Sequence, residues 1–148
     1  MTEYLTIIGR QDKVDLPELG LLNIEVKIDT GAYTSSINCS RVKVKVIDGV
    51  KTLTFYIAGS RIQEKKARRF STTAFEQRKI RSSNGITETR YVIDTSIVLF
   101  GKKKKLELSL ADRSKMKFPI LIGRKFLTDR FVVNVSEKNL SYKQKLKK

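Results

Sequence analysis

The sequence contains no histidine and a single cysteine, Cys39, among its 148 residues. The absence of histidine excludes Ser-His-Asp chemistry and the usual zinc ligand sets, and one cysteine cannot form a disulfide within the chain. No glycine-rich phosphate loop is present, so the sequence offers no support for ATP binding. We therefore expect no metal and no cofactor, and we expect Cys39 to be a small buried residue without special reactivity.

Long apolar segments are also lacking. No stretch approaches the roughly 18 apolar residues of a membrane span. Residues 1–10 show no basic segment ahead of an apolar run, which a signal peptide would have. The sequence therefore predicts a cytoplasmic protein with no membrane partner.

Acidic residues are scarce over most of the chain. Residues 1–50 carry six basic and seven acidic side chains, whereas residues 51–148 carry 25 and eight, a net charge of +17. Such a field attracts polyanions, including nucleic acids and acidic peptides. The basic residues at the end of the chain indicate a disordered tail over residues 141–148, after a single domain over residues 1–140.

The dominant sequence period is two, which predicts a mainly β domain. Apolar and polar residues alternate in four segments, which are typical of half-buried strands: 23–28, 42–46, 53–57 and 106–110. Continuous apolar runs favour strands buried on both faces at residues 118–123 and 131–135.

Turn and helix signals complete this prediction. Asn84-Gly85 between two strand-like segments, about 78–82 and 86–93, indicates a β-hairpin. Gly101 indicates a second turn between neighbouring strands. The best helix candidate runs from Arg124 to about Asp129, and residues 59–76, the least strand-like interior stretch, are interpreted as a basic loop or insertion.

The segment most suggestive of chemistry is Asp29-Thr30-Gly31-Ala32, which directly follows an alternating strand. By average composition, an Asp-Thr-Gly tripeptide arises by chance in a chain of this length about 3% of the time. Alone it also fits an ordinary aspartate that caps a turn. A second element favours a functional interpretation of this segment, because an apolar strand over residues 118–122 ends in Gly123-Arg124 and a short helix.

Together the two motifs resemble the retropepsins, and more closely the bacterial retropepsin-like proteins associated with RimK glutamate ligases. The resemblance covers about residues 5–135. It implies a closed β-barrel domain with one short C-terminal helix, in which the second motif, Ile122, Gly123 and Arg124, lies beside the active-site loop. It also assigns catalytic roles to Asp29, Thr30 and Gly31, and substrate contacts to Ala32 and to a flap at Asn84, Gly85 and Ile86.

Hydrolysis of this type needs two carboxylates that share one proton, one acting as base on a water and the other polarising the carbonyl. A chain of 148 residues is too short for two such lobes, so we expect a homodimer with one Asp29 from each subunit. Asp94-Thr95-Ser96 is the one internal rival. It lacks the glycine, and we expect Asp94 to be a strand-edge residue.

The resemblance also implies an acidic substrate, either a glutamate-rich peptide or a polyglutamylated protein, which the basic charge would attract. The predicted function is therefore an aspartic endopeptidase that acts as a homodimer. Two alternatives stay open. One is a retropepsin-like module that binds acidic peptides without cleaving them, and the other is a basic β-module that binds nucleic acid, for which charge is the sole evidence.

Overall fold

The computed structural model describes residues 5–58, 66–81, 84–112 and 117–147. Strands dominate the described residues, as the period-two pattern predicts. In chain order the elements are β1 (Thr6–Ile8), β2 (Gln11–Leu16), a 3₁₀ turn (Pro17–Leu19), β3 (Leu21–Ile28), β4 (Ser35–Asn38), β5 (Ser40–Ile47), β6 (Val50–Ile57), β7 (Arg68–Thr72), β8 (Phe75–Arg81), β9 (Thr87–Leu99), β10 (Lys102–Ala111), β11 (Ile120–Ile122), α1 (Arg124–Leu127), β12 (Phe131–Val133) and α2 (Leu140–Leu146).

The body of the molecule is a seven-stranded sheet in the order β10-β4-β11-β3-β2-β9-β8. A further pairing between β9 and β10 joins the sheet to itself, so six of these strands form a ring and β8 lies outside it. The ring encloses the apolar core, which includes Ile37, Ile97, Leu108 and Ile120, each fully buried. Closure removes most of the unpaired strand edges of the body.

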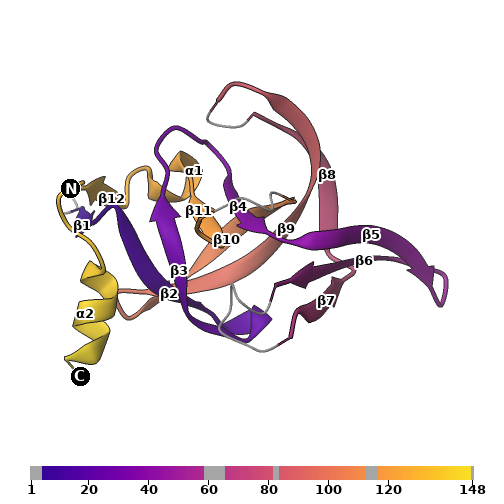
Figure 1. Cartoon of the computed structure of the whole chain (residues 1–148), viewed down its shortest axis with the longest axis horizontal. Coiled ribbons are helices and arrows are strands. Elements are labelled where there is room, and N and C mark those ends of the chain that lie inside the picture. The colour runs from indigo at the N-terminus through magenta and orange to yellow at the C-terminus, as the bar shows by residue number, and fades with distance from the viewer. Residues whose placement is uncertain (1–4, 59–65, 82–83, 113–116, 148) are drawn as a thin grey trace.

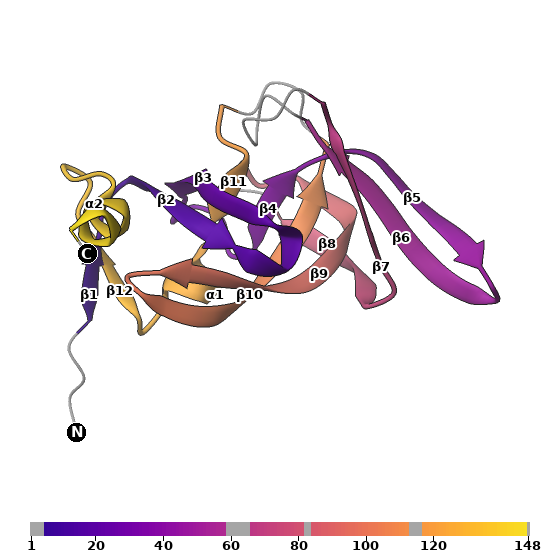
Figure 2. The same cartoon turned by 90° about the horizontal axis from the view of Figure 1, so that it is seen from below.

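A second, three-stranded sheet in the order β5-β6-β7 projects from the body (Figures 1 and 2). Its inner face packs Leu53, Phe55 and Ile57 into the core, each at most 1% exposed. The far end of the β5–β6 hairpin extends away from the body into solvent. Residues 59–76 were predicted to be a loop, which is wrong for the described part that forms β7 and the start of β8; residues 59–65 lie outside the described residues.

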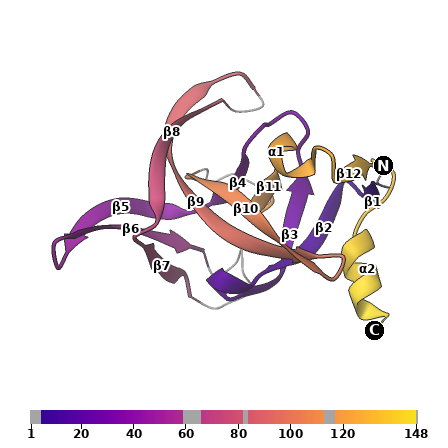
Figure 3. The ribbon, with the colours of Figure 1, turned by 180° about the vertical axis from the view of Figure 1, so that it is seen from behind.

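The first and last strands of the described chain lie together on one side of the ring (Figure 3). Strands β1 and β12 pair in parallel as a separate two-stranded sheet, with Ile7 opposite Val132. The expectation that residues 131–135 form a strand buried on both faces is wrong, because Val132 is 50% exposed and Val135 is 73% exposed. Strand β11 is closer to the expected strand buried on both faces, since Ile120 and Ile122 are buried and Leu121 is half-buried.

The prediction of a disordered tail after residue 140 is also wrong, because residues 140–146 form helix α2. Asp12 on β2 is 1% exposed, and its carboxylate accepts hydrogen bonds from the backbone N–H groups of Ser141 and Tyr142 at 2.9 and 3.0 Å. The Ser141 hydroxyl accepts a further hydrogen bond from the backbone N–H of Phe100 at 2.7 Å. A carboxylate at the first turn of a helix satisfies its free N–H groups, so α2 docks through polar contacts.

The described residues therefore include two short α-helices near the C-terminus where one was expected, and α1 begins at the predicted residue, Arg124. In the part of the chain that the structure describes, no helix is long and apolar enough to cross a membrane.

Candidate active site

Asp29 is the first residue after β3. Strand β3 alternates buried and exposed side chains and ends at Ile28, which faces the core. The backbone N–H of Asp29 donates to the carbonyl of Ile122 on the neighbouring parallel strand β11, at 2.8 Å. The chain then turns, and the N–H of Gly31 donates to Oδ1 of Asp29 at 3.1 Å. The carboxylate is half-buried and its orientation is set by its own turn.

The second motif holds this turn from the other side. The N–H of Arg124 donates to the carbonyl of Ala32 at 2.8 Å, and the N–H of Lys125 donates to the carbonyl of Tyr33 at 2.9 Å. Both donors belong to the first turn of α1, where backbone N–H groups have no partner within the helix. The loop therefore supplies acceptors that the helix start requires, which joins residues about 90 positions apart.

Gly123 lies where the backbone of the second motif passes closest to the backbone of the Asp29 loop. A Cβ at this position would lie 2.6 Å from the carbonyl oxygen of Tyr33 and 2.8 Å from that of Ala32. Both are backbone atoms that cannot rotate away, so glycine is required by the close approach and not by its φ angle, which is negative. The N–H of Gly123 donates to Oγ of the buried residue Ser35, at 2.9 Å.

Arg124 has a partner that the sequence did not identify. Its Nη1 donates to the carbonyl oxygen of Thr30 at 2.8 Å, and its guanidinium lies 5.9 Å from the centre of the Tyr33 ring. The side chain is exposed and bridges the first motif from outside. The structure thus brings together Asp29, Thr30, Gly31 and Ala32 with Ile122, Gly123 and Arg124.

Asn84, Gly85 and Ile86 come from a different part of the fold. They lie at the end of the β8–β9 hairpin, which confirms the hairpin prediction, and all three are exposed. Oδ1 of Asn84 accepts from the N–H of Ile86 at 3.2 Å, within the turn itself. In Figure 1 this end of the hairpin curves back toward the side of the ring where the loop after β3 and helix α1 lie.

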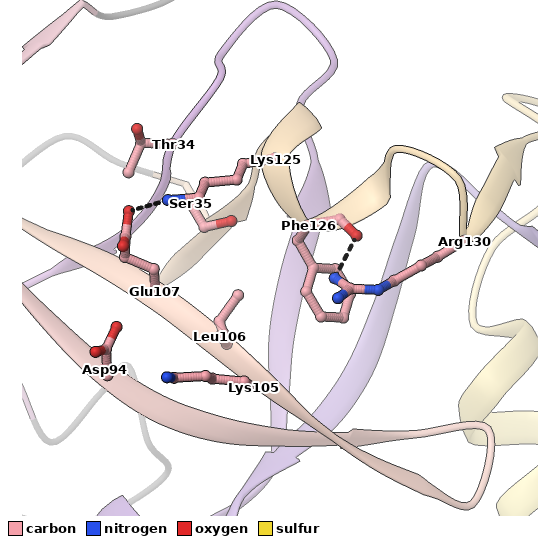
Figure 4. A pocket seen from close by; sticks show the side chains of 9 residues that line it. All are labelled: Thr34, Ser35, Asp94, Lys105, Leu106, Glu107, Lys125, Phe126 and Arg130. Atoms are coloured by element: carbon pink, nitrogen blue, oxygen red, sulfur yellow. Dashed lines mark hydrogen bonds and ion pairs between the residues drawn. The ribbon is translucent and has the colours of Figure 1, made fainter.

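Asp94 lies in the middle of β9, directly opposite Glu107 on β10. It lines a pocket of about 300 Å³ together with Thr34, Ser35, Lys125 and other side chains of β10 and α1 (Figure 4). The lining does not include Asp29, Thr30 or Gly31. An aspartate in a regular strand pairing has neither the turn nor the backbone N–H donor that shapes the Asp29 site.

Glu107 is the central charge beside this pocket. Both of its carboxylate oxygens are paired with the Arg78 guanidinium, and Lys125 Nζ lies 3.1 Å from Oε1. The hydrogen bonds from Arg78, followed by that from Lys125, lower the pKa of Glu107 below its usual range. Lys125 thus links the clamped loop to β10, a role that no local sequence signal indicates, and the same holds for Ser35.

Cys39 is 4% exposed, and burial raises the pKa of its thiol to about 12. A thiol with so high a pKa is not a nucleophile near neutral pH. Among the described residues, no three carboxylate or thiol side chains gather in a way that could hold a metal ion.

A ring of strands whose Asp-Thr-Gly loop is clamped by a strand–Gly–Arg–helix element defines the retropepsin-like class. The chain belongs to the RimB-like family, whose model, described as "retropepsin-like aspartic endopeptidase RimB", matches residues 7–144. The predicted mainly β, retropepsin-like fold is therefore confirmed.

Curated relatives carry a different description. Two bacterial proteins named "probable alpha-L-glutamate ligase" resemble this chain. The one from Desulfotalea psychrophila is 34% identical over 86% of the chain, and the one from Shewanella pealeana is 32% identical over 93%. The matched residues make up 28% and 30% of these relatives, so the chain spans less than a third of their length.

A solved structure has the same fold. It is the crystal structure of a Legionella pneumophila protein described as having unknown function, with a TM-score of 0.73 and 22% sequence identity. The match covers 92% of this chain and 98% of the other.

Proposed function

We propose that the protein is an aspartic endopeptidase that works as a homodimer, with the two copies of Asp29 as its catalytic pair. The observation that carries this proposal is the loop of residues 29–33. Its carboxylate accepts a backbone hydrogen bond, and the loop is clamped by Gly123, Arg124 and Lys125. One carboxylate would act as general base on a water molecule, while its protonated partner would donate a hydrogen bond to the carbonyl of the scissile peptide.

A second subunit is needed because one half-buried aspartate cannot hold both protonation states at once. Asp94 does not suit the second role, since it sits in the β9–β10 ladder opposite Glu107. With Asp29 on a two-fold axis, two identical loops would meet, and like charges at about 3 Å would share one proton.

The surface beside Asp29 suits contact between two copies. Strands β1 and β12 pair only with each other among the described residues, and Ile7 and Val132 are 53% and 50% exposed. The N–H of Ile28, next to Asp29, donates to the carbonyl of Arg10 at 2.9 Å, and Arg10 lies two residues after the end of β1. An apolar sheet with free edges gains from pairing with a second copy.

Acidic, glutamate-rich peptides are the proposed substrates. Residues 51–148 carry a net charge of +17, which would speed encounter with polyanions more than it would lower the chemical barrier. The relatives' name, alpha-L-glutamate ligase, supports a context of glutamate polymers. Asn84, Gly85 and Ile86 would contact the substrate as a flap, with Ala32 beside the catalytic pair.

Incubation with end-blocked oligoglutamate peptides, followed by mass spectrometry, tests this function. We expect cleavage by the native protein and loss of at least about a thousandfold in Asp29→Asn, which keeps the shape of the side chain but cannot act as base. Asp94→Asn is the matched control and should keep activity within about threefold.

The substrate class is tested in the same assay. An oligoglutamine peptide of equal length should be cleaved more slowly than oligoglutamate at low salt, and the difference should shrink as salt screens the charges. Equal rates at low salt would contradict the acidic preference. Cleavage unaffected by Asp29→Asn would contradict the enzymatic proposal, and binding without any turnover would favour the non-catalytic alternative.

A further inference from the structure

The outer edge of β5 is an unpaired strand edge on the projecting sheet. Strand β5 pairs with β6 along one side, and no strand among the described residues pairs with its other side. Figures 1 and 2 show β5 at the rim of this sheet, with the far end of the strand away from the body. A free edge presents a row of N–H and C=O groups that an extended peptide can pair with.

The turn of the hairpin shows which backbone groups face outward. Asp48 and Gly49 have φ angles of 51° and 78°, and they join Ile47 and Val50, which are directly opposite each other. In such a two-residue hairpin the closing pair exchanges backbone hydrogen bonds, and the bonded pairs then alternate along the ladder. Lys43, Lys45 and Ile47 therefore bond to β6, while the N–H and C=O groups of the valines between them point outward.

The side chains along this edge form two different faces. Val44 and Val46 project from one face and are 37% and 69% exposed. Lys43 and Lys45 project from the other face and are also exposed. None of the ion pairs within the described residues involves either lysine. The edge thus combines free backbone groups, an apolar stripe and two unneutralised cations.

This combination selects its partner by charge. Pairing with the same edge of a second copy would bring lysines close to lysines, which is unfavourable across a strand pair. A strand with carboxylates opposite Lys43 and Lys45 would neutralise them, and apolar residues between the carboxylates would cover Val44 and Val46. A nucleic acid could neutralise the lysines, but its phosphates would meet the outward C=O groups of the valines, which are also acceptors.

We propose that the outer edge of β5 binds an acidic polypeptide segment as an added strand, in which acidic and apolar residues alternate. Because side chains alternate along a strand, the acidic residues would lie beside Lys43 and Lys45, and the apolar residues beside Val44 and Val46. This surface does not depend on hydrolysis at Asp29. It would hold such a segment even if the protein cleaved nothing.

The experiment uses the full chain with Asp29→Asn, so that turnover cannot consume the peptide. The probe is a fluorescein-labelled, end-blocked octapeptide of alternating glutamate and valine, measured by fluorescence anisotropy at low salt. Reversing the two charges with Lys43→Glu/Lys45→Glu should weaken binding at least about tenfold. Lys102→Glu/Lys103→Glu changes the net charge equally at the β9–β10 turn and should weaken it less than about threefold.

Two further measurements test strand addition itself. Bound peptide should slow the amide hydrogen exchange of Val44 and Val46 by at least about tenfold and leave that of Lys45, already bonded to β6, nearly unchanged. Val44→Pro removes an outward N–H without removing a bond to β6, so it should weaken binding about fivefold or more while circular dichroism stays native.

Three results would overturn the proposal. One is equal loss of binding in the two charge-reversal variants, which would mean a diffuse electrostatic effect. Another is the absence of slowed exchange at Val44 and Val46 under saturating peptide. The third is an oligonucleotide of equal charge that displaces the peptide and loses its own affinity in Lys43→Glu/Lys45→Glu, which would assign the surface to nucleic acid.

Discussion

The loop that carries Asp29 and the β5–β6 hairpin are both turns between strands, yet they are held in different ways. The loop is fixed by residues about 90 positions away, through hydrogen bonds from Arg124 and Lys125 and the close approach of Gly123. The end of the hairpin is held by its own ladder, in which Ile47 lies opposite Val50, and it extends away from the body (Figure 1). A loop held by distant residues is disturbed by substitutions far from it in the sequence. A turn held by its own two strands can change its shape when a binding partner pairs with it.

The largest expected contrast lies between two glycine substitutions. Gly123→Ala places a Cβ within 2.8 Å of two backbone carbonyls, so the loop must move, and we expect a loss of about 3 kcal/mol of stability together with activity. The Cβ added by Gly49→Ala would have no atom within 4 Å, so the substitution is opposed only by the φ angle of +78°. We expect it to lower the free energy of unfolding by about 1 kcal/mol. Urea unfolding of both variants measures the difference, and equal costs would remove the contrast.

The contribution to stability of the contacts next to the clamped loop can be tested at Glu107, which pairs with Lys125 and Arg78. These partners lower the pKa of Glu107, so the folded-state value lies below the unfolded value of about 4.5. The stabilisation is therefore fully present above about pH 4.5 and is lost as the pH falls through the folded-state pKa. We expect Glu107→Gln to cost about 1–2 kcal/mol at neutral pH.

The control for that prediction is the pH dependence itself. Chemical unfolding of the native protein and of Glu107→Gln should differ at neutral pH, and the difference should shrink as the pH falls through the folded-state pKa of Glu107. A difference that stays constant with pH would show that the glutamine alters packing and that the ionised pair contributes little.

The smallest effect is expected at the end of the hairpin. Val46 is 69% exposed, so Val46→Thr should change the free energy of unfolding by less than about 0.5 kcal/mol. Thermal unfolding measures this directly. A loss above 1.5 kcal/mol, on the order of a buried aliphatic side chain, would mean that the hairpin packs against something more than solvent.

Most of the strands were predictable from alternating or continuous apolar residues, and in β3 this alternation matches one buried face. The expected half-burial is wrong for β5, where Val44 and Val46 are exposed, and strands β1, β2 and β4 were not predicted. The pairing of Asp29 with the Gly123 motif was predictable from resemblance and not from local pattern. Strand β7 was missed because its segment, residues 68–72, is basic and has one large apolar residue, Phe70. Its structure comes from pairing with β6, a contact that periodicity does not report.

Helix α2 was missed for a related reason. Its lysines indicate a solvated tail, but Asp12 and Asp15 lie about 130 residues earlier and hold it, the latter through Lys145 at 3.0 Å. The same limit applies to Ser35 and to the partner of Arg124. Each of these contacts joins residues that are far apart in the sequence, so no local pattern predicts it. The closed ring of strands brings the residues together.

The central claim is that Asp29 acts as one half of a pair supplied by two subunits. Native chains and Asp29→Asn chains can be unfolded, mixed in varied ratios and refolded at constant total concentration, and hydrolysis of an oligoglutamate peptide then measured. If only dimers with two aspartates are active, the rate falls as the square of the native fraction, and an equal mixture keeps about a quarter of the activity. A linear fall, with about half of the activity kept, would contradict the claim.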